Sequence, residues 1–464
     1  MTQLSERSDR RRARTLTEAL KSFEHSGLVT LLTRRPDLCY PLPRDLAELS
    51  TRAGTATSIA RAMDQLNVWL RLVCEALAAL PDPSSADDVA ALIEVSADVA
   101  SDAVADLRER ALLWGGDNQL HLVRGVREYF DPYPGGLAPP SPRPLTRDHI
   151  EAALAECDPS ARSVLQRLLW SPTGAVRNAD RVVDIAGARS PLEQLLARQL
   201  LRPLDTDTVI LPREVALQLR NHKFSAVPIA PTPPPVTGPA RNAALVDQAA
   251  AGAAFGLLHD LEHAVQSLES TPHRLLRTGG LSTRDVSVLA RNLGTDVAHA
   301  SFVMECASAA GLVAPASSLR LLPTADYDRW AARDGATRWR ALVDAWLRGM
   351  RHYSRSAEPG AHVLGPEADA PTAPSLRRLV LELGVEAGVG TQIELTGLTE
   401  IVAWHQPRAA RSATVALATL VDWTWREAGW LGLNSLGAVS SYAQAALTAD
   451  RPLPPHLVDL FPSP

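Results

Sequence analysis

Lysine is almost absent from this chain of 464 residues: it occurs only at Lys21 and Lys223, and arginine supplies the other 45 of the 47 basic side chains. A phosphate-binding loop of the GxxxxGK[ST] type needs a glycine directly before its lysine, because backbone amides and the ammonium group must converge on the phosphates. Leu20 precedes Lys21, and His222 precedes Lys223. The sequence therefore excludes a P-loop motor. We attribute the arginine bias to genome composition rather than to phosphate binding.

Cysteine and long apolar runs are also scarce. The chain has no CxxC pair, so neither a disulfide framework nor a cysteine zinc site is indicated. The four cysteines are widely scattered: Cys39, Cys74, Cys157 and Cys306. No stretch approaches the roughly 18 uninterrupted apolar residues of a membrane span. Residues 13–32 contain Glu18, Lys21 and Glu24 where a secretory signal would be apolar. We expect a cytoplasmic protein, with nucleoid association as a further option, and no membrane partner.

The formal net charge of −5 argues against a protein that is coated in nucleic acid along its length. Hydrophobic residues make up 46% of the chain, which is enough for buried cores. A chain of this length corresponds to about three domains of ~150 residues each. Bulk composition thus predicts a soluble protein of several domains without identifying its partner.

The most informative feature is a pattern that occurs four times. A helical stretch ends in a short apolar segment, a polar break and a second apolar stretch follow, and then another helical pattern begins. The four apolar segments are 111–114, 199–202, 310–313 and 428–431. Helix, turn, short strand pair and closing helix is the order of a winged-helix module, and the unequal spacing argues against a solenoid. We expect a mainly α protein with small β-wings, built of tandem winged-helix modules joined by proline-rich linkers.

Two proline-rich connectors divide this pattern, DPYPGGLAPPSPRP at 131–144 and VPIAPTPPPVTGPA at 227–240. The second favours extended polyproline II, hence a semi-rigid spacer. The predicted organisation is a basic start and N-terminal helices at 1–58, winged-helix modules at 59–130, 147–225 and 242–330, a helical insert plus a fourth module at 335–450, and a linker at 451–464 where a longer chain is cut.

Charge separates the four presumed recognition helices into two kinds. Residues 97–112 carry four acidic and two basic side chains, and residues 295–312 carry Asp296 and Glu305 with no arginine or lysine. An acidic helix in the major groove would be repelled by the phosphates on both sides. These two modules are therefore predicted to bind protein or to pack internally.

The helices at 190–203 and 408–427 are more basic, and either could contact a backbone phosphate, although a solvated helix face is the stronger alternative for both. The segment RSDRRRAR (7–14) adds a basic start. The predicted nucleic-acid contacts are Arg10, Arg11, Arg12, Arg14, Arg198, Arg202, Arg408 and Arg411.

One local string resembles a catalytic motif. HDLEH at 259–263 places His259 and His263 four positions apart on a helix, with Glu262 between them, as in inverted zincins. A working zinc site needs a third ligand and a cleft, and a chance match among 12 histidines is easy. We therefore expect no catalytic residue, no cofactor and no bound metal. Two tryptophans, Trp423 and Trp425, stand two apart on a helix, so one is predicted to reach another module or a partner.

Several extended segments resemble the XPB-like helicase-associated proteins of actinobacteria. They are LLTRRPDLCYPLPRDLAELSTRAG (31–54), CEALAAL (74–80), RALLWGGDNQLHLVR (110–124), VILPREVALQLR (209–220), LRTGGLSTRDV (276–286) and EAGWLGL (427–433). The architecture is also similar to the fifty-two-kilodalton winged-helix subunit of TFIIH, which docks and stimulates the XPB translocase. Family members continue past a point like Pro464 into a helicase-associated region, so the chain resembles the amino-terminal part. The resemblance supplies no catalytic residue.

These observations predict a non-enzymatic winged-helix scaffold that is an accessory of an XPB-like DNA helicase or another DNA-processing protein, in DNA repair, with weak non-specific DNA binding and no small-molecule substrate. Two alternatives remain open. One is a transcriptional regulator that reads an operator, which needs base-reading side chains on a recognition helix. The other is a zinc hydrolase that uses His259 and His263.

Overall fold

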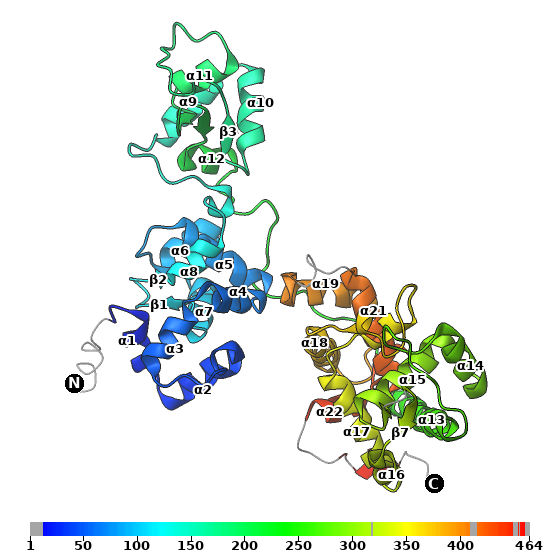
Figure 1. The fold of residues 1–464 in the computed structure, drawn as a ribbon. Coiled ribbons are helices and arrows are strands. Elements are labelled where there is room, and N and C mark those ends of the chain that lie inside the picture. Colours follow the sequence, from blue (N-terminus) through cyan, green and yellow to red (C-terminus); the bar gives the residue numbers. More distant parts are fainter. Residues whose placement is uncertain (1–12, 317–318, 409–414, 449–452, 454, 460–464) are drawn as a thin grey trace, which may run out of the picture. The chain divides into compact units, whose positions relative to one another are not determined.

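The computed structural model describes residues 13–316, 319–408, 415–448, 453 and 455–459. The chain divides into two compact units, residues 1–232 and 233–464, and the division lies inside the proline-rich segment 227–240. The fold is mainly helical, with 56% helix and 7% strand, and its strands form small antiparallel sheets (Figure 1). The expected class, mainly α with small sheets, is therefore confirmed.

The first unit begins with four short helices and one 3₁₀ turn around a small leucine core, which includes Leu20, Leu31 and Leu49. Side chains of Thr15, Asp45 and Thr55 accept hydrogen bonds from backbone amides at three of the helix starts, as good N-caps do. The elements are α1 (Leu16–Lys21), α2 (His25–Arg34), η1 (Pro36–Leu38), α3 (Leu46–Ala53) and α4 (Ala56–Asp64).

The first repeat follows these helices. A Ser85–Asp88 capping box starts its second helix. The chain between its first two helices forms an isolated antiparallel bridge, Ser84 to Leu120, beside the hairpin. Gly115 turns the hairpin with φ +97°, and a Cβ there would lie 2.1 Å from the Gln119 carbonyl oxygen. The elements are α5 (Val68–Ala79), α6 (Ala86–Ile93), α7 (Ala97–Glu109), β1 (Leu113–Trp114), β2 (His121–Leu122) and α8 (Arg124–Tyr129).

The second repeat has a similar order with two differences. Its first strand is regular, and the sheet order is β3-β5-β4, so the last strand lies between the other two. Residues 176–190, between the first strand and the next helix, are turns and irregular backbone instead of a helix. The elements are η2 (Pro134–Gly136), α9 (Arg147–Ala155), α10 (Pro159–Leu168), β3 (Thr173–Ala175), α11 (Pro191–Ala197), β4 (Arg202–Pro203), β5 (Thr208–Ile210) and α12 (Arg213–Leu219).

The second unit contains the third and fourth repeats. The bridge beside the hairpin is Arg274 to Arg320 in the third repeat and Gln392 to Ala438 in the fourth. The third comprises α13 (Ala243–Ser270), α14 (Thr283–Leu293), α15 (Val297–Ala309), β6 (Val313–Pro315), β7 (Leu321–Pro323) and α16 (Ala325–Ala331). The fourth comprises α18 (Ala373–Glu386), α19 (Leu395–His405), α21 (Leu417–Trp430), β8 (Asn434–Ser435), β9 (Ala438–Val439) and α22 (Ser441–Leu447), and α23 (Pro455–Val458) follows it.

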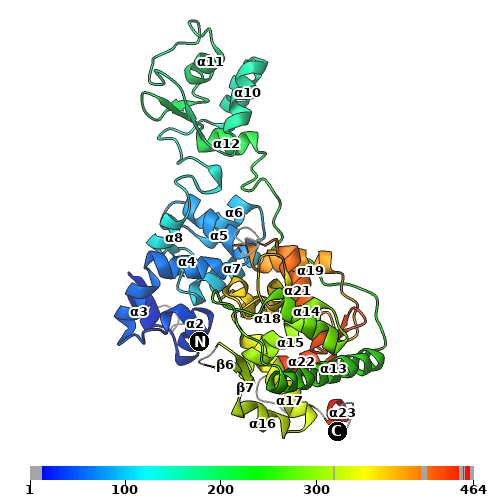
Figure 2. The same ribbon diagram turned by 45° about the vertical axis from the view of Figure 1, so that its right-hand side comes forward.

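The two repeats of the second unit share one hydrophobic core, which extends from Ala250 to Ala446. Between them lie α17 (Gly335–Arg348) and the 3₁₀ turns η3 (Tyr353–Ala357) and η4 (Pro366–Ala368). Helix α17 inserts Trp339 and Trp346, both fully buried. The Trp339 indole donates to the Leu431 carbonyl oxygen at 2.7 Å. Figure 2 shows α15, α18 and α21 grouped together within this unit.

A buried arginine joins the N-terminal helices to the first repeat. Arg35 is fully buried and pairs bidentately with Asp37, at 2.9 and 3.1 Å. It also donates to the Ser58 hydroxyl at 2.6 Å and to the Arg110 carbonyl oxygen at 3.1 Å. A buried charge is tolerated only when it is paired and hydrogen-bonded, so this one side chain fixes three elements together.

We expect Arg35→Ala to destabilise the first unit by about 3–5 kcal/mol, because Asp37 would stay buried without its counter-charge. The measurement is urea denaturation monitored by hydrogen-exchange mass spectrometry of peptides from residues 13–130. Arg34→Ala is the matched control. The Arg34 side chain is about a third exposed and pairs with Asp106 and Glu109, so we expect its removal to destabilise the unit by about 1 kcal/mol or less. Equal losses for the two variants would contradict the proposed role of Arg35.

Candidate interaction surfaces

The third helix of each repeat is the element that a DNA-reading module would place in the major groove. On α7, Asp98 and Asp102 are exposed. Further along the same helix, Asp106 and Glu109 bind the Arg34 guanidinium at 2.9 and 3.0 Å. The exposed part of α7 is therefore acidic, whereas Asp106 and Glu109 attach α7 to α2 through Arg34.

Helix α15 is also unsuited to entering a DNA groove, because most of it is buried. Residues 300–307 are all buried, and Glu305 is only 1% exposed. The prediction that counted Glu305 as surface charge is therefore wrong, because this carboxylate lies inside the second unit. Of the two predicted fates for this helix, binding protein or packing internally, the structure has internal packing.

Helix α21 is also covered on most of its circumference. It contacts α13, α18, α19 and η3. Trp423 and Trp425 are both buried, at 4% and 9% exposure. One of them was predicted to reach another module or a partner, and the Trp423 ring lies 6.3 Å from the ring of His352, in the segment after α17.

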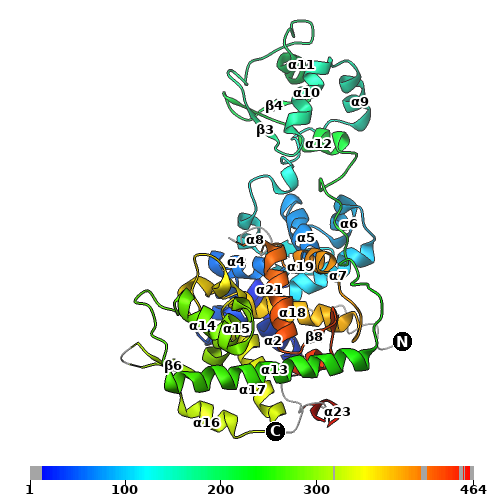
Figure 3. The same cartoon turned by 90° about the vertical axis from the view of Figure 1, so that its right-hand side faces the viewer.

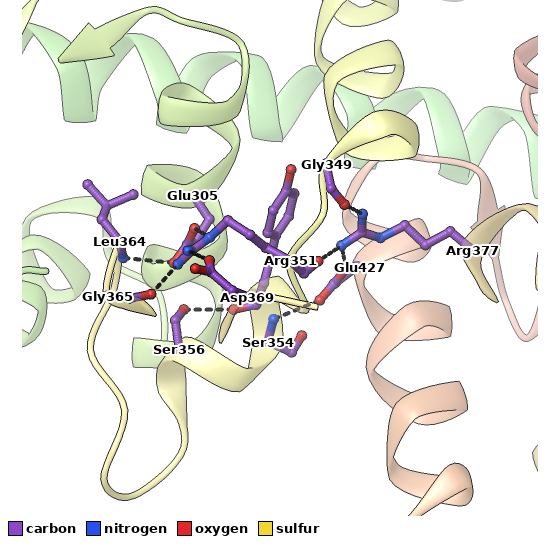
Figure 4. A network of polar contacts seen from close by, with 11 residues as sticks. Glu305, Gly349, Arg351, Ser354, Ser356, Leu364, Gly365, Asp369, Arg377 and Glu427 are labelled. Atoms are coloured by element: carbon purple, nitrogen blue, oxygen red, sulfur yellow. Dashed lines mark hydrogen bonds and ion pairs between the residues drawn. The ribbon is translucent and has the colours of Figure 1, made fainter. Parts of the chain in front are cut away.

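A buried ionic network connects α15 and α21 to the segment after α17 (Figure 4). The Glu305 carboxylate accepts hydrogen bonds from Arg351 Nε at 3.0 Å, Arg351 Nη2 at 3.1 Å and the Leu364 amide at 2.8 Å. Arg351 also donates to the Gly365 carbonyl oxygen at 2.6 Å and forms an ion pair with Asp369. Burial raises the pKa of Glu305, and the Arg351 guanidinium opposes this shift. The network thus fastens the segment after α17 onto α15.

A second buried pair fastens the same segment onto α21. Glu427 accepts from the Ser354 amide and from the Trp346 indole, each at 2.7 Å. Arg377, also buried, lies 3.6 Å from Glu427. Arg377 donates to the carbonyl oxygens of Trp346 at 2.6 Å and Gly349 at 2.7 Å. Its guanidinium lies over the Trp346 ring, 5.0 Å from the centroid. The segment after α17, which reads as a Pro/Gly/Ala stretch, is therefore a packed part of the core.

His352 lies in this segment, and burial lowers its pKa from 6.5 to about 4, with the Arg377 charge adding to the shift. Between these values the unfolded chain binds a proton that the folded chain does not. The contribution of His352 to stability is therefore complete above about pH 6.5 and is lost as the pH falls towards 4.

We expect His352→Gln to flatten the pH dependence of unfolding of the second unit. One proton corresponds to a slope of about 1.4 kcal/mol per pH unit in the wild-type protein over this window. Glu305, with its raised pKa, titrates in both proteins, so the difference between the two curves isolates His352. Urea unfolding measured from pH 4 to pH 7.5 tests this; parallel curves would rule out the proposed effect of His352.

Four of the residues predicted to contact nucleic acid lie within the described residues, each in a different segment. Arg14 is exposed before α1. Arg198 is 13% exposed and lies 3.4 Å from Glu156, which neutralises it. Arg202 is half-buried in β4, and Arg408 is exposed just after α19. Arg10, Arg11, Arg12 and Arg411 lie outside the described residues. The structure therefore weakens the case for Arg198 and does not test the others.

One open groove, of about 1540 Å³, lies between α1 and the β1–β2 hairpin, and Arg14 lines it. The Trp114 and His121 rings, which also line it, stack at 4.1 Å between centroids. Lys21 and Glu18 also line it, as do Arg108 and Asp117, which form an ion pair at 2.9 Å. With charges of both signs on its walls, the groove has no marked electrostatic preference.

The HDLEH string lies on α13. His259 and His263 are exposed, with ring centroids 6.4 Å apart, and Glu262 forms an ion pair with Arg338. Among the described residues, no group of three or more His, Cys, Asp or Glu side chains is placed to hold a metal ion. The carboxylate that the zincin pattern would use as a base thus serves a structural ion pair.

No protein-family model matches the sequence, and neither a curated protein nor a solved structure is detectably similar to it. The resemblance to helicase-associated proteins therefore rests on the sequence segments alone. Within the described residues, no helix has both the length and the apolar character needed to cross a bilayer.

Proposed function

We propose that each repeat is a winged-helix module and that the chain is a non-enzymatic scaffold, an accessory of an XPB-like DNA helicase or translocase in DNA repair. The order of elements supports the first part. In three repeats the segment after the first helix, and in the second repeat β3 after α10, pairs with the second arm of a hairpin that follows the third helix. A hairpin bordered in this way is the wing of such a module.

The observation that carries the scaffold proposal is the state of the third helices. Base reading needs Arg, Lys, Asn or Gln on a helix that can enter the major groove. Helices α15 and α21 are covered by their own unit, and α7 presents Asp98 and Asp102 to solvent. Modules that cannot offer this helix to DNA are better suited to binding protein.

The same observation argues against an operator-reading regulator. Of the third helices, only α11 remains, and it has seven residues with Arg198 engaged by Glu156. A selection for preferred duplex sequences would reveal a regulator, since a specific reader enriches one motif and a scaffold does not. The metal alternative is weakened by the Glu262–Arg338 ion pair. Elemental analysis with stoichiometric zinc in the purified protein would restore it.

We expect the full-length protein to copurify with an XPB-like motor from its host and to raise the ATPase rate of that motor when it is added back. Reversing the exposed charges of α7, in Asp98→Arg/Asp102→Arg, is expected to weaken the complex about tenfold, because like charges then oppose across the interface. The control reverses two exposed acids of the second unit, Asp328→Arg/Glu394→Arg. Copurification of no DNA-processing protein would contradict the proposed function.

The basic start is expected to add weak, sequence-indifferent DNA binding. Replacing Arg10, Arg11, Arg12 and Arg14 by alanine should reduce the slope of log K against log salt by up to about 3.6, since each phosphate contact contributes about 0.9. Fluorescence anisotropy with two unrelated duplexes at several salt concentrations measures this. Tight binding that survives high salt would argue against a purely electrostatic contact.

A further inference from the structure

A pair of arginines stands out at the hairpin of the third repeat, Arg320 before β7 and Arg274 on the segment bridged to it. Arg274 and Arg320 lie directly opposite each other in an antiparallel bridge. Both side chains are exposed. Directly opposed residues of an antiparallel pair project from the same face, with Cβ atoms about 4.5–5.5 Å apart. The two guanidinium groups are therefore presented together to solvent. Figure 3 shows this hairpin, marked by β6, at one end of the long helix α13.

Neither arginine has a counter-charge. Across the part of the chain that the structure describes, no acidic side chain forms an ion pair with either one. The antiparallel bridge between Arg351 and Asp369 differs in this respect, because its two opposed residues carry opposite charges and form an ion pair. Like charges directly opposite each other destabilise a strand pair. The fold thus carries an unfavourable contact that no packing requirement explains.

The residues around the pair form no ion pair with it among the described residues, and another arginine lies close in sequence. One acid contacts this segment: Asp285 lies 3.8 Å from His273. Since successive residues of an extended strand point to opposite faces, His273 and Asp285 lie on the face away from Arg274. Arg277, also exposed and without an ion pair among the described residues, follows at the start of the Gly279–Gly280 turn.

We propose that this hairpin binds the phosphate backbone of duplex DNA through Arg274 and Arg320. The inference rests on the proposed function, an accessory of a DNA motor, and moves its main DNA contact from the second and fourth repeats to the third. Guanidinium groups form bidentate, charge-assisted hydrogen bonds with phosphates, and bound phosphates relieve the mutual repulsion of the pair.

Duplex DNA fits better than an acidic polypeptide. Along one strand a phosphate recurs about every 3.4 Å of helix axis, so two long side chains whose Cβ atoms lie about 4.5–5.5 Å apart can reach neighbouring phosphates. The hairpin offers no base-reading amide beside the pair, and α15, the third helix behind it, is buried. Contacts confined to phosphates position a protein on DNA without reading sequence.

The test compares the full-length protein with Arg274→Gln/Arg320→Gln by fluorescence anisotropy on a short labelled duplex. The variant is expected to bind about tenfold more weakly at low salt, and its slope of log K against log salt should fall by about 1.8, or 0.9 for each lost contact. Its thermal midpoint should stay the same or rise, because the variant removes a repulsion. The charge-matched control is Arg333→Gln/Arg348→Gln, which changes two exposed arginines of the same unit.

The outcomes separate this inference from the scaffold proposal. An unchanged affinity and salt slope in Arg274→Gln/Arg320→Gln, or an equal loss in the control, would overturn the inference while motor copurification still stands. An equal loss of affinity for polyglutamate would reassign the pair to acidic polypeptides. Absence of any duplex binding by the wild-type protein would also overturn it. Loss of motor copurification with DNA binding retained would overturn the scaffold proposal alone.

Discussion

The second unit depends on the burial of two carboxylates that are held by arginines. Glu305 and Glu427 would each cost several kcal/mol if they were left unpaired inside a protein. Arg351 and Arg377 offset this cost, and both reach them from segments outside the helices that carry the carboxylates. The chain between α17 and α18 must therefore take one path. That path places two repeats around a single core and fixes how α15 and α21 are covered.

This arrangement has a direct consequence for function. A helix that is buried on most of its sides cannot enter a DNA groove without breaking the core around it. In the second unit the surface that remains for ligands consists of hairpins and the outer faces of helices, where Arg274 and Arg320 lie. In the first unit, α7 keeps an exposed acidic stretch. The two units therefore offer different chemistry to partners, despite the same order of elements.

Arginine has a structural role that its abundance conceals. Arg35, Arg220 and Arg377 are all buried, and each donates to backbone carbonyl oxygens. Arg220 binds Gly135 and Gly136 in the first proline-rich connector and lies over the Trp170 ring at 3.9 Å. A planar guanidinium with five donors suits such junctions better than the compact ammonium of lysine. Part of that connector is thus held against the second repeat.

The sequence by itself determined the local order of the structure. Apolar segments and polar breaks predict the order of helices and hairpins in the four repeats, because this order depends on neighbouring residues. Which side chains are buried depends on distant ones. Nothing near Glu305 predicts that Arg351 will neutralise it, and nothing near Glu427 predicts that the Trp346 indole and the Ser354 amide will bind it. Only the tertiary structure decided this, since burial and pairing of charges are set where segments far apart in the sequence meet.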